Sequence, residues 1–474
     1  MSRTRLAAGL LGTVLVGSTV AGPAAQAQRA PTPGAVGVGD PYFPDDGNGG
    51  IDVLHYDIRD SYSFGRGRLA GRTSLDVRAT QDLSRFDLDF LLPVRSVRVD
   101  GAEARFHTTG TYELRITPSA PIATGARFKV SVEYAGTPAS EGSHGERNWL
   151  ADDREVVAMN EPHMAAWWFP ANDHPSDKAT YDIRVTVPDG KDVVANGIKV
   201  SSDHRRGQVT SHWRMTQPMA SYLAFFAAGS FAVSRTTCLG VPNVFALSKR
   251  TPEAAPGKAV KAYAEQTCDI VTSLSGLLGP YPFSATGGLV TSLPVHFALE
   301  NQSRPTYPWV GAADPGLMSH ELAHQWFGDL VSVAQWRDIW LNEGFAEFMS
   351  DYYTAEVTGH GSLQQGLVSS YDAFSDEAGF WKLQIDDPGP AHVFDGAVYT
   401  RGAMTLQALR HRIGDPAFWT LLRTWLAQHA YGNGSVAGFE ALAASVSGQD
   451  LTGFFDAWLH QPVVPARTAA NGLV

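Results

Sequence analysis

Two histidines and a glutamate occur at a spacing that suits a metal ion. His320 and His324 lie four positions apart, and Glu321 directly follows the first histidine. On a helix, residues four apart project from the same face, one turn apart along the axis, so both imidazoles can reach one ion. A catalytic zinc takes three protein ligands and leaves the fourth position to water. Glu321 can face that water without binding the metal, as the general base of an H-E-x-x-H motif does.

The third ligand is expected from a second helix that folds back against the first. The apolar-periodic segment WLNEGFAEF carries Glu343, 19 residues after His324. We choose Glu343 as the third ligand and expect one Zn²⁺ per chain. Glu347, one turn further on, is either a hydrogen-bond acceptor for a ligand histidine or a solvated helix acid. The alternative for the whole motif is a pair of solvated helix faces, which does not account for the distant acid.

The elements that must position these residues fall into two halves with different periods. From about Ile51 to Phe231, short alternating segments separated by turn residues predict a mostly antiparallel β domain. Asp100-Gly101 between two alternating runs predicts a hairpin turn. Beyond about residue 255 the apolar period becomes helical. One long helix is expected to bury one face, which consists of Val260, Tyr263, Ala264, Thr267, Ile270, Val271, Leu274 and Leu278.

Further helices and a small sheet are expected in the second half. Asp314-Pro315 and Asp415-Pro416 each predict an N-cap followed by a first-turn proline. The first of these helices is expected to end at Gly328-Asp329, and residues 290–302, VTSLPVHFALENQ, to form a strand. The chain is therefore predicted to be an α+β, multidomain protein. The expected divisions are a lead-in at 28–50, an N-terminal β domain at 51–235, an α-rich catalytic domain with a small sheet at 236–465 and a tail at 466–474.

The first 27 residues have the pattern of a secretory signal peptide. Arg3 and Arg5 precede an apolar run from Leu6 to Val16, and a small-residue stretch ends in Ala27. The run is shorter than the ~20 apolar residues that a membrane span needs, which argues against a membrane anchor. We expect cleavage after Ala27 and a secreted protein.

Charge and cysteine content narrow the possible partners. The formal net charge is -11 and no basic tract is present, so nucleic acid and anionic membranes are poor candidates. Two cysteines are present, Cys238 and Cys268. An oxidising compartment favours a disulfide between them over two buried thiols.

Four motifs together resemble the aminopeptidase N family of gluzincin zinc peptidases, to which the leukotriene-epoxide hydrolases also belong. In chain order they are HFALENQSRPTY, HELAHQWFGDL, WLNEGFAEF and VYTRGAMTLQAL, and the resemblance extends from about Asp40 to Pro462. It implies a saddle-shaped antiparallel β domain followed by a thermolysin-like catalytic domain. Because the chain ends soon after FFDAWLHQP, it implies a short form without the C-terminal helical domain of longer relatives.

The resemblance also implies roles for individual residues. His320, His324 and Glu343 match the zinc ligands, and Glu321 matches the general base. Tyr399, expected just before a helix that starts at the Arg-Gly pair of VYTRG, matches the tyrosine that stabilises the tetrahedral intermediate.

Substrate-binding positions follow from the same resemblance. Glu300 and Glu161 match the two glutamates that bind the free α-amine of a peptide. Ala298, Leu299 and Asn301 complete the substrate-binding stretch around Glu300. The usual motif is Gly-x-Met-Glu-Asn, from which Phe297-Ala298-Leu299 departs, so the side-chain preference of the first pocket stays open.

The sequence thus predicts a secreted zinc aminopeptidase acting on peptides with a free N-terminus. The nearest alternative is a secreted endopeptidase with an open cleft, which blocked peptides would distinguish. Epoxide hydrolysis and a catalytically idle exported peptide-binding or metal-binding protein are further alternatives. No pattern in the sequence predicts the oligomeric state or the preferred N-terminal residue.

Overall fold

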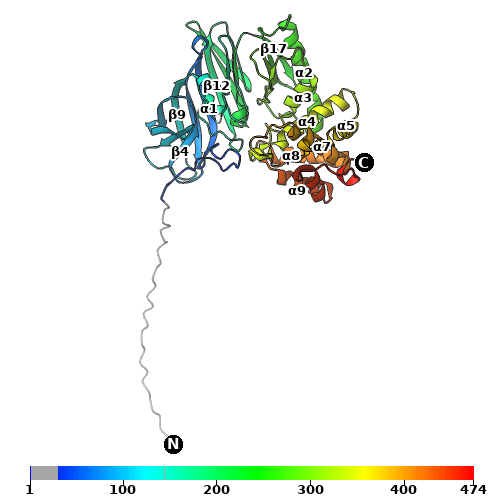
Figure 1. Cartoon of the computed structure of the whole chain (residues 1–474). Helices are drawn as coiled ribbons and strands as arrows, with labels where there is room; N and C mark the ends of the chain where they lie inside the picture. The colour runs from blue at the N-terminus through cyan, green and yellow to red at the C-terminus, as the bar shows by residue number, and fades with distance from the viewer. Residues whose placement is uncertain (2–29, 144) are drawn as a thin grey trace. The chain divides into compact units, whose positions relative to one another are not determined.

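The computed structural model describes Met1, residues 30–143 and residues 145–474 (Figure 1). Residues Pro31–Val474 form one compact unit. Apart from Met1, the predicted signal peptide at 1–27 lies outside the described residues. Within the part of the chain that is described, no helix combines the length and the apolar character that crossing a bilayer requires.

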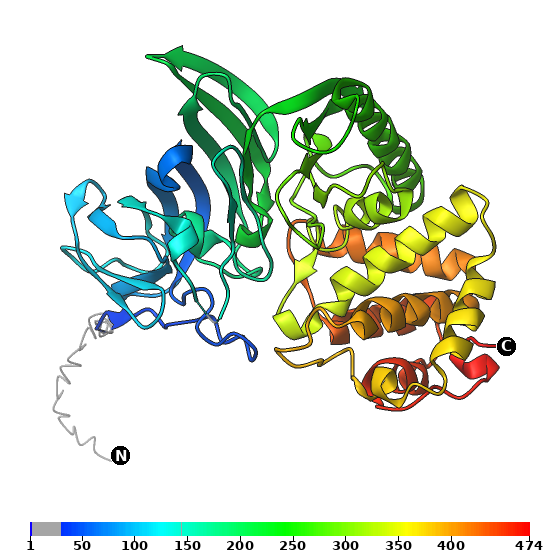
Figure 2. The same ribbon diagram turned by 45° about the horizontal axis from the view of Figure 1, so that its top comes forward.

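An eight-stranded sheet is the largest element of the strand-rich N-terminal part (Figure 2). Neighbouring strands pair antiparallel except β2 and β12, which are parallel. Asp100 and Gly101 both have positive φ and join β5 to β6, which confirms the predicted hairpin. In spatial order the strands are β14 (Ile198–Arg205), β15 (Gln208–Met219), β12 (Ala179–Pro188), β2 (Ile51–Ser63), β3 (Arg68–Ala79), β9 (Arg127–Gly136), β5 (Val94–Val99) and β6 (Ala102–Glu103).

Two smaller sheets complete this part. One has the order β1 (Thr32–Pro33), β4 (Leu83–Asp89), β8 (Glu113–Thr117) and β7 (Arg105–Thr109). The other has the order β10 (Trp149–Ala151), β11 (Val156–Ala158), β16 (Phe226–Gly229) and β13 (Asp192–Ala195). The short helix α1 (Ala165–Trp168) is entirely buried. The prediction of a mostly antiparallel β domain is confirmed, with β1·β4 and β2·β12 as parallel exceptions.

The lead-in segment is tied to the helix-rich part by one carboxylate. Asp40 is 1% exposed, and it accepts hydrogen bonds from the backbone N–H groups of Tyr42 and Trp336, each at 2.8 Å. Trp336 belongs to a 3₁₀ turn, Trp336–Asp338, that leads into helix α4 (Trp340–Tyr352). Asp40 therefore helps to fix the start of a helix that carries a predicted metal ligand.

The helix-rich part contains a four-stranded sheet with the long helix α2 (Pro256–Leu278) packed against it. The strands lie in the order β17 (Phe231–Cys238), β18 (Val241–Ser248), β19 (Thr286–Thr291) and β20 (Thr306–Pro308). The buried residues of α2 are the eight predicted from the sequence, which confirms that interpretation. The predicted domain boundary at 235 falls within β17, and the domain divisions stay predictions.

The predicted strand at 290–302 is wrong for most of its length. Only Val290 and Thr291 belong to β19. Ser292 then turns out of the ladder, because its N–H and its hydroxyl both donate to the buried carboxylate of Glu155, at 3.2 and 2.8 Å. Pro294 follows and supplies no N–H to a ladder. The residues up to 302 are therefore a loop, apart from an isolated antiparallel bridge between Leu299 and Thr306.

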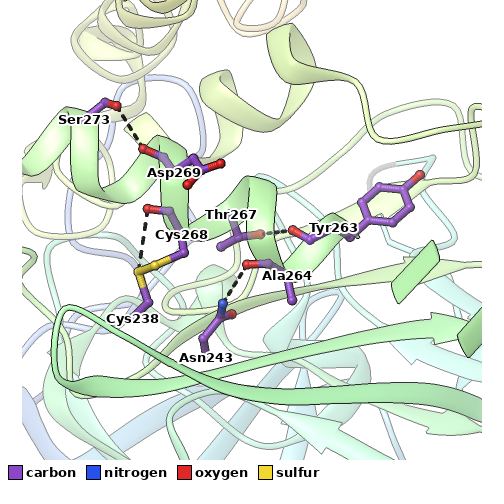
Figure 3. The surroundings of a disulfide bond; sticks show 8 residues. All are labelled: Cys238, Asn243, Tyr263, Ala264, Thr267, Cys268, Asp269 and Ser273. Atoms are coloured by element: carbon purple, nitrogen blue, oxygen red, sulfur yellow. Dashed lines mark hydrogen bonds between the residues drawn. A yellow bond between two sulfur atoms is a disulfide. The ribbon is translucent and has the colours of Figure 1, made fainter. Parts of the chain in front are cut away.

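A disulfide fastens α2 to the end of β17 (Figure 3). Cys238 and Cys268 have their Cα atoms 5.5 Å apart and are bonded, which confirms the expected pairing. Close by, the Asn243 side-chain amide donates to the carbonyl of Ala264 at 2.8 Å.

The remaining helices follow in chain order and form the C-terminal part. They are α3 (Pro315–Ala323), α4 (Trp340–Tyr352), α5 (Leu363–Phe374), α6 (Ala378–Lys382), α7 (Gly396–Ile413), α8 (Asp415–His429), α9 (Val436–Ser447) and α10 (Thr452–Phe455). Two short strands, β21 (Ser332–Val333) and β22 (Asn433–Gly434), pair parallel. The fold is thus a sheet-rich N-terminal part followed by a helical part with a small sheet, as predicted.

The two predicted N-caps have different outcomes. Asp314 caps α3, because its carboxylate accepts from the N–H groups of Gly316 and Leu317 at 2.9 and 3.1 Å. Asp415 does not cap α8, whose N-cap is Gly414. The Asp415 carboxylate instead accepts two hydrogen bonds from Arg410, at 2.9 and 2.8 Å. Arg410 thus binds both carboxylate oxygens that an N-cap residue would use to accept from backbone N–H groups.

Helices α4 and α7 approach each other closely at two glycines. A Cβ on Gly344 would lie 2.8 Å from the backbone of Gly402, and one on Gly402 would lie 2.6 Å from Gly344. Both distances are shorter than real Cβ contacts allow. This close approach brings Tyr399 of α7 to the face of α4 that carries Glu343.

Candidate active site

Helix α3 and the turn that follows it carry both histidines. Helix α3 ends at Ala323, five residues before the predicted Gly328, and His324 is its C-cap residue. The His324 N–H still donates to the His320 carbonyl at 3.3 Å, so the two side chains keep the one-turn relation of a helix. Their Nε2 atoms are 3.2 Å apart.

Helix α4 supplies the third predicted ligand. The Glu343 Oε2 atom lies 3.4 Å from His320 Nε2 and 3.3 Å from His324 Nε2. The ligand atoms of His320, His324 and Glu343 all lie within 4.8 Å of one another, and the three residues are buried. Two imidazole nitrogens and a carboxylate oxygen are a donor set that suits zinc.

The other ring nitrogens have partners that fix the two imidazoles. His320 Nδ1 is 2.9 Å from Glu347 Oε2, and His324 Nδ1 is 2.9 Å from the Phe327 carbonyl oxygen. A carbonyl oxygen only accepts, so His324 Nδ1 donates and its Nε2 lone pair is left for a metal. Of the two interpretations of Glu347, the structure supports the hydrogen-bond acceptor over the solvated acid.

Electrostatics at the three residues favour a positive charge between them. Burial lowers the pKa of His324, but the Glu343 and Glu300 carboxylates outweigh it and raise the pKa to about 9. Burial opposes ionisation of Glu343, yet the two histidines lower its pKa to about 2. A cation at the Nε2 atoms is therefore stabilised by the carboxylate.

Glu321, the predicted general base, follows His320 on helix α3. It is 5% exposed and lines the same cavity as the three ligands. Burial raises its pKa to about 7, against the opposing effect of His320 and His324. A carboxylate that titrates near neutral pH can both accept and return a proton.

Tyr399 lies inside helix α7, and the predicted helix start at the following Arg-Gly pair is wrong. Asp395 caps α7 by accepting from the Ala397 N–H at 3.0 Å, which starts the helix at Gly396. The Tyr399 ring stacks on the His320 ring with centroids 5.8 Å apart. Burial, and next the Glu343 carboxylate, raise the Tyr399 pKa well above its ordinary value. The hydroxyl therefore stays protonated and can donate.

Glu161 and Glu300 converge beside the metal ligands although 139 positions separate them. Ligand atoms of Glu161, Glu300 and Glu343 lie within 4.8 Å of one another. In each of the first two, Oε1 is buried without a hydrogen-bond partner among the described residues. Burial, and next the Glu300 carboxylate, raise the pKa of Glu161 well above its ordinary value. Burial also raises the pKa of Glu300, against the opposing effect of His324. Such a pair favours a cationic ligand.

The stretch before Glu300 forms part of the cavity wall. Phe297, Ala298 and Leu299 line the cavity, and Leu299 is held by backbone hydrogen bonds in both directions with Thr306, each 2.8 Å long. Asn301 is not brought into the cavity. It is fully buried, and its Oδ1 accepts from the Thr306 hydroxyl at 2.9 Å. The Asn301 side chain therefore stabilises the loop from the protein interior, because its hydrogen-bond partner Thr306 is buried.

The cavity has a volume of about 660 Å³. It is also lined by residues that the sequence did not indicate, Asn160, Gly316, Leu317, Ser350 and Phe394. Phe394 is 37% exposed. Neither spacing nor composition points to it, because it lies in a connecting segment ahead of α7.

Comparisons with known proteins agree with this geometry. The Peptidase M1 N-terminal domain matches residues 55–223, and the Peptidase family M1 domain matches residues 289–458. Among curated relatives, a leucyl aminopeptidase of Saccharolobus solfataricus is 25% identical over 89% of this chain and 55% of its own length. Aminopeptidase N of Lactococcus lactis subsp. lactis is 28% identical over 67% of this chain and 40% of its own length. The chain therefore spans about half or less of the length of these relatives.

Solved structures give a second, independent comparison. An M1 zinc metallopeptidase from Deinococcus radiodurans has a TM-score of 0.81 and 29% identity, covering 91% of this chain and 99% of its own. A mutant of that protein, bound to a Tyr-Ser-Ala substrate, has a TM-score of 0.81 and 27% identity. The family and these neighbours, together with the ligand geometry, indicate a zinc cofactor. Since the two matched segments carry the ligand triad, Glu321, Tyr399 and both convergent glutamates in one cavity, the chain belongs to peptidase family M1.

Proposed function

We propose that this protein is a zinc-dependent aminopeptidase that removes N-terminal residues from peptides with a free α-amine. The observation that supports this most directly is the position of Glu161 and Glu300. A carboxylate oxygen of each lies within 4.8 Å of a Glu343 oxygen, and each Oε1 atom is buried without a hydrogen-bond partner among the described residues. A peptide ammonium bound there would place the first peptide bond beside the metal ligands.

Different side chains bind the metal, transfer the proton and stabilise the developing negative charge. When bound by His320, His324 and Glu343, zinc acts as a Lewis acid and lowers the pKa of a water molecule. The Glu321 carboxylate accepts a proton from that water as the carbonyl carbon is attacked, and passes it to the leaving amine. The Tyr399 hydroxyl donates a hydrogen bond to the former carbonyl oxygen as negative charge develops there.

Selection for a free N-terminus follows from the two glutamates. Charge-assisted hydrogen bonds contribute about 1.5 to 3 kcal/mol each, so two bonds to an ammonium amount to at least ~3 kcal/mol. Because 1.36 kcal/mol corresponds to a factor of ten, an acetylated peptide should lose at least ~10² in kcat/KM. The acetylated peptide also leaves the buried carboxyl groups of Glu161 and Glu300 facing a neutral amide.

The test is a comparison of kcat/KM for one peptide with free and acetylated N-termini. Glu300→Ala and Glu161→Ala should reduce cleavage of the free peptide and narrow its advantage over the acetylated one, Glu161→Ala more weakly. Glu265→Ala is the matched control, because Glu265 is an exposed acid of α2 outside the cavity. Equal cleavage of the two peptides by the native protein, or internal fragments in mass spectra, would instead establish an endopeptidase.

Secretion is a separate proposal that rests on residues 1–27. Expression with the complete N-terminus in a host that exports proteins should release a mature form that begins at Gln28. Intact-mass analysis of the culture medium and the cell fraction measures this. A full-length product confined to the cytoplasm would refute it.

A further inference from the structure

A second cavity adjoins the zinc cavity along helix α4. It has a volume of about 380 Å³ and is bounded by α4, α5, α7 and the segment between α4 and α5. Glu347 lines both cavities, so the two meet at that side chain. The wall of the second cavity is rich in hydroxyl and amide groups, which include Ser362, Gln365, Ser369, Thr400 and Gln407.

An acidic stripe on α4 leads from the metal ligands into this cavity. Glu343, Glu347 and Asp351 follow one another at intervals of four residues on α4. With a rise of 1.5 Å per residue, Glu347 lies about 6 Å and Asp351 about 12 Å from Glu343 along the helix axis. The stripe thus runs from the ligand triad to Asp351, an exposed residue that lines the second cavity.

The second cavity has an excess of negative charge. Its lining includes the carboxylates of Glu347 and Asp351 but no lysine or arginine. A cationic side chain entering from the zinc cavity would supply the missing positive charge, and the hydroxyl and amide groups would accept its remaining hydrogen bonds.

The direction of a bound peptide determines which side chain reaches the stripe. Glu161 and Glu300 hold the α-amine in the proposed function, and the first peptide bond lies at the metal ligands. The second residue is therefore the first one beyond the cleaved bond, and the two cavities meet at Glu347, beside the metal ligand His320. A lysine side chain, with its four-carbon stem, extends roughly 6 Å from its Cα. This matches the ~6 Å rise from Glu343 to Glu347, so the ammonium would lie level with Glu347, about one helix turn from Asp351.

We propose that the second cavity binds the side chain of the second residue of the substrate and favours lysine or arginine there. The proposal rests on the aminopeptidase function proposed above. It makes Asp351 a specificity-determining residue that contacts neither the metal nor the cleaved bond.

The experiment measures kcat/KM for free-amine peptides that differ only at the second residue, with Lys, Gln or Glu in that position. The native protein should cleave the Lys peptide about tenfold better than the Gln peptide, and the Glu peptide least well. Asp351→Asn should reduce the Lys-to-Gln ratio to within about twofold, and the charge reversal Asp351→Lys should favour the Glu peptide. The matched control is Asp269→Asn, an exposed aspartate of α2 outside both cavities.

An aminoacyl arylamide, which has no second residue, separates this proposal from the function on which it rests. Its turnover should be the same in the native protein and in Asp351→Asn. Cleavage of the arylamide and of all three peptides without a preference for Lys would overturn the assignment of the cavity and leave the aminopeptidase function intact. A preference that appears at the third residue, or one that survives both Asp351 variants, would overturn it as well. No cleavage of any free-amine substrate would overturn both proposals.

Discussion

Removal of the Glu347 carboxylate should weaken zinc binding without removing a ligand. Glu347 Oε2 lies 2.9 Å from His320 Nδ1 and fixes the orientation of that ring. In Glu347→Ala the imidazole loses its acceptor, so its tautomer and rotation are no longer set and its Nε2 becomes less basic. Loss of such a partner costs 10- to 100-fold in metal affinity, which is about 1.4 to 2.8 kcal/mol.

The magnitude should depend on what replaces the carboxylate. Glu347→Gln keeps an oxygen that can accept the same hydrogen bond but loses the charge, so its effect should be smaller than that of Glu347→Ala. His320→Ala, which removes the ligand itself, should have a larger effect than either. Zinc affinity should therefore decrease in the order native protein, Glu347→Gln, Glu347→Ala and His320→Ala. This order follows from the hydrogen bond between His320 Nδ1 and Glu347.

The assay is competition for zinc against a chromophoric chelator, with Glu265→Ala as the control acid. At saturating zinc the Glu347→Ala protein should regain most of the native kcat, because Glu321 and Tyr399 are untouched. An unchanged zinc Kd in Glu347→Ala would show that the hydrogen bond to His320 has no part in holding the metal. A loss as large as that of His320→Ala would show that Glu347 is itself a ligand.

Three further predictions concern the base, the oxyanion donor and the disulfide. Glu321→Gln should bind one zinc per chain, by elemental analysis, and lose most of its turnover; a native kcat would exclude Glu321 as the proton acceptor. Tyr399→Phe should lower kcat by ~10² to 10³ with little change in KM, the scale of one lost oxyanion donor, and a change confined to KM would make Tyr399 a binding residue. The double variant Cys238→Ser/Cys268→Ser should lower the free energy of unfolding by ~3 to 4 kcal/mol, because the bridge closes a sequence separation of 30 residues; chemical denaturation measures this, and an unchanged midpoint would contradict it.

Short-range patterns predicted those features that depend on local geometry. The spacing of His320 and His324 works because residues four apart on a helix share a face whatever the surrounding fold. The buried face of α2 was predicted residue by residue for the same reason, since a period of 3.6 selects one side of any packed helix. Asp314 caps α3 because its carboxylate meets N–H groups only two and three residues away.

Two predictions failed where a side chain outside the predicted segment competed with its local pattern. The expected strand at 290–302 ends early because Ser292 donates to Glu155, which lies far away in sequence. Asp415 pairs with Arg410 on the preceding helix and leaves the cap position to Gly414. In neither case does the segment itself contain the competing group.

The sequence by itself determined the metal-binding motif, the helical face of α2, the N-cap of α3 and the resemblance that relates Glu161, Glu300 and Tyr399 to one site. Only the tertiary structure decided that Glu347 bonds His320, that Asn301 turns away from the cavity, and that Asp351 lies in a second cavity next to the first. The physical reason is that a side chain's partner is set by packing between elements. On α4, Glu343, Glu347 and Asp351 are equivalent in spacing, and the neighbouring helices alone give them different surroundings.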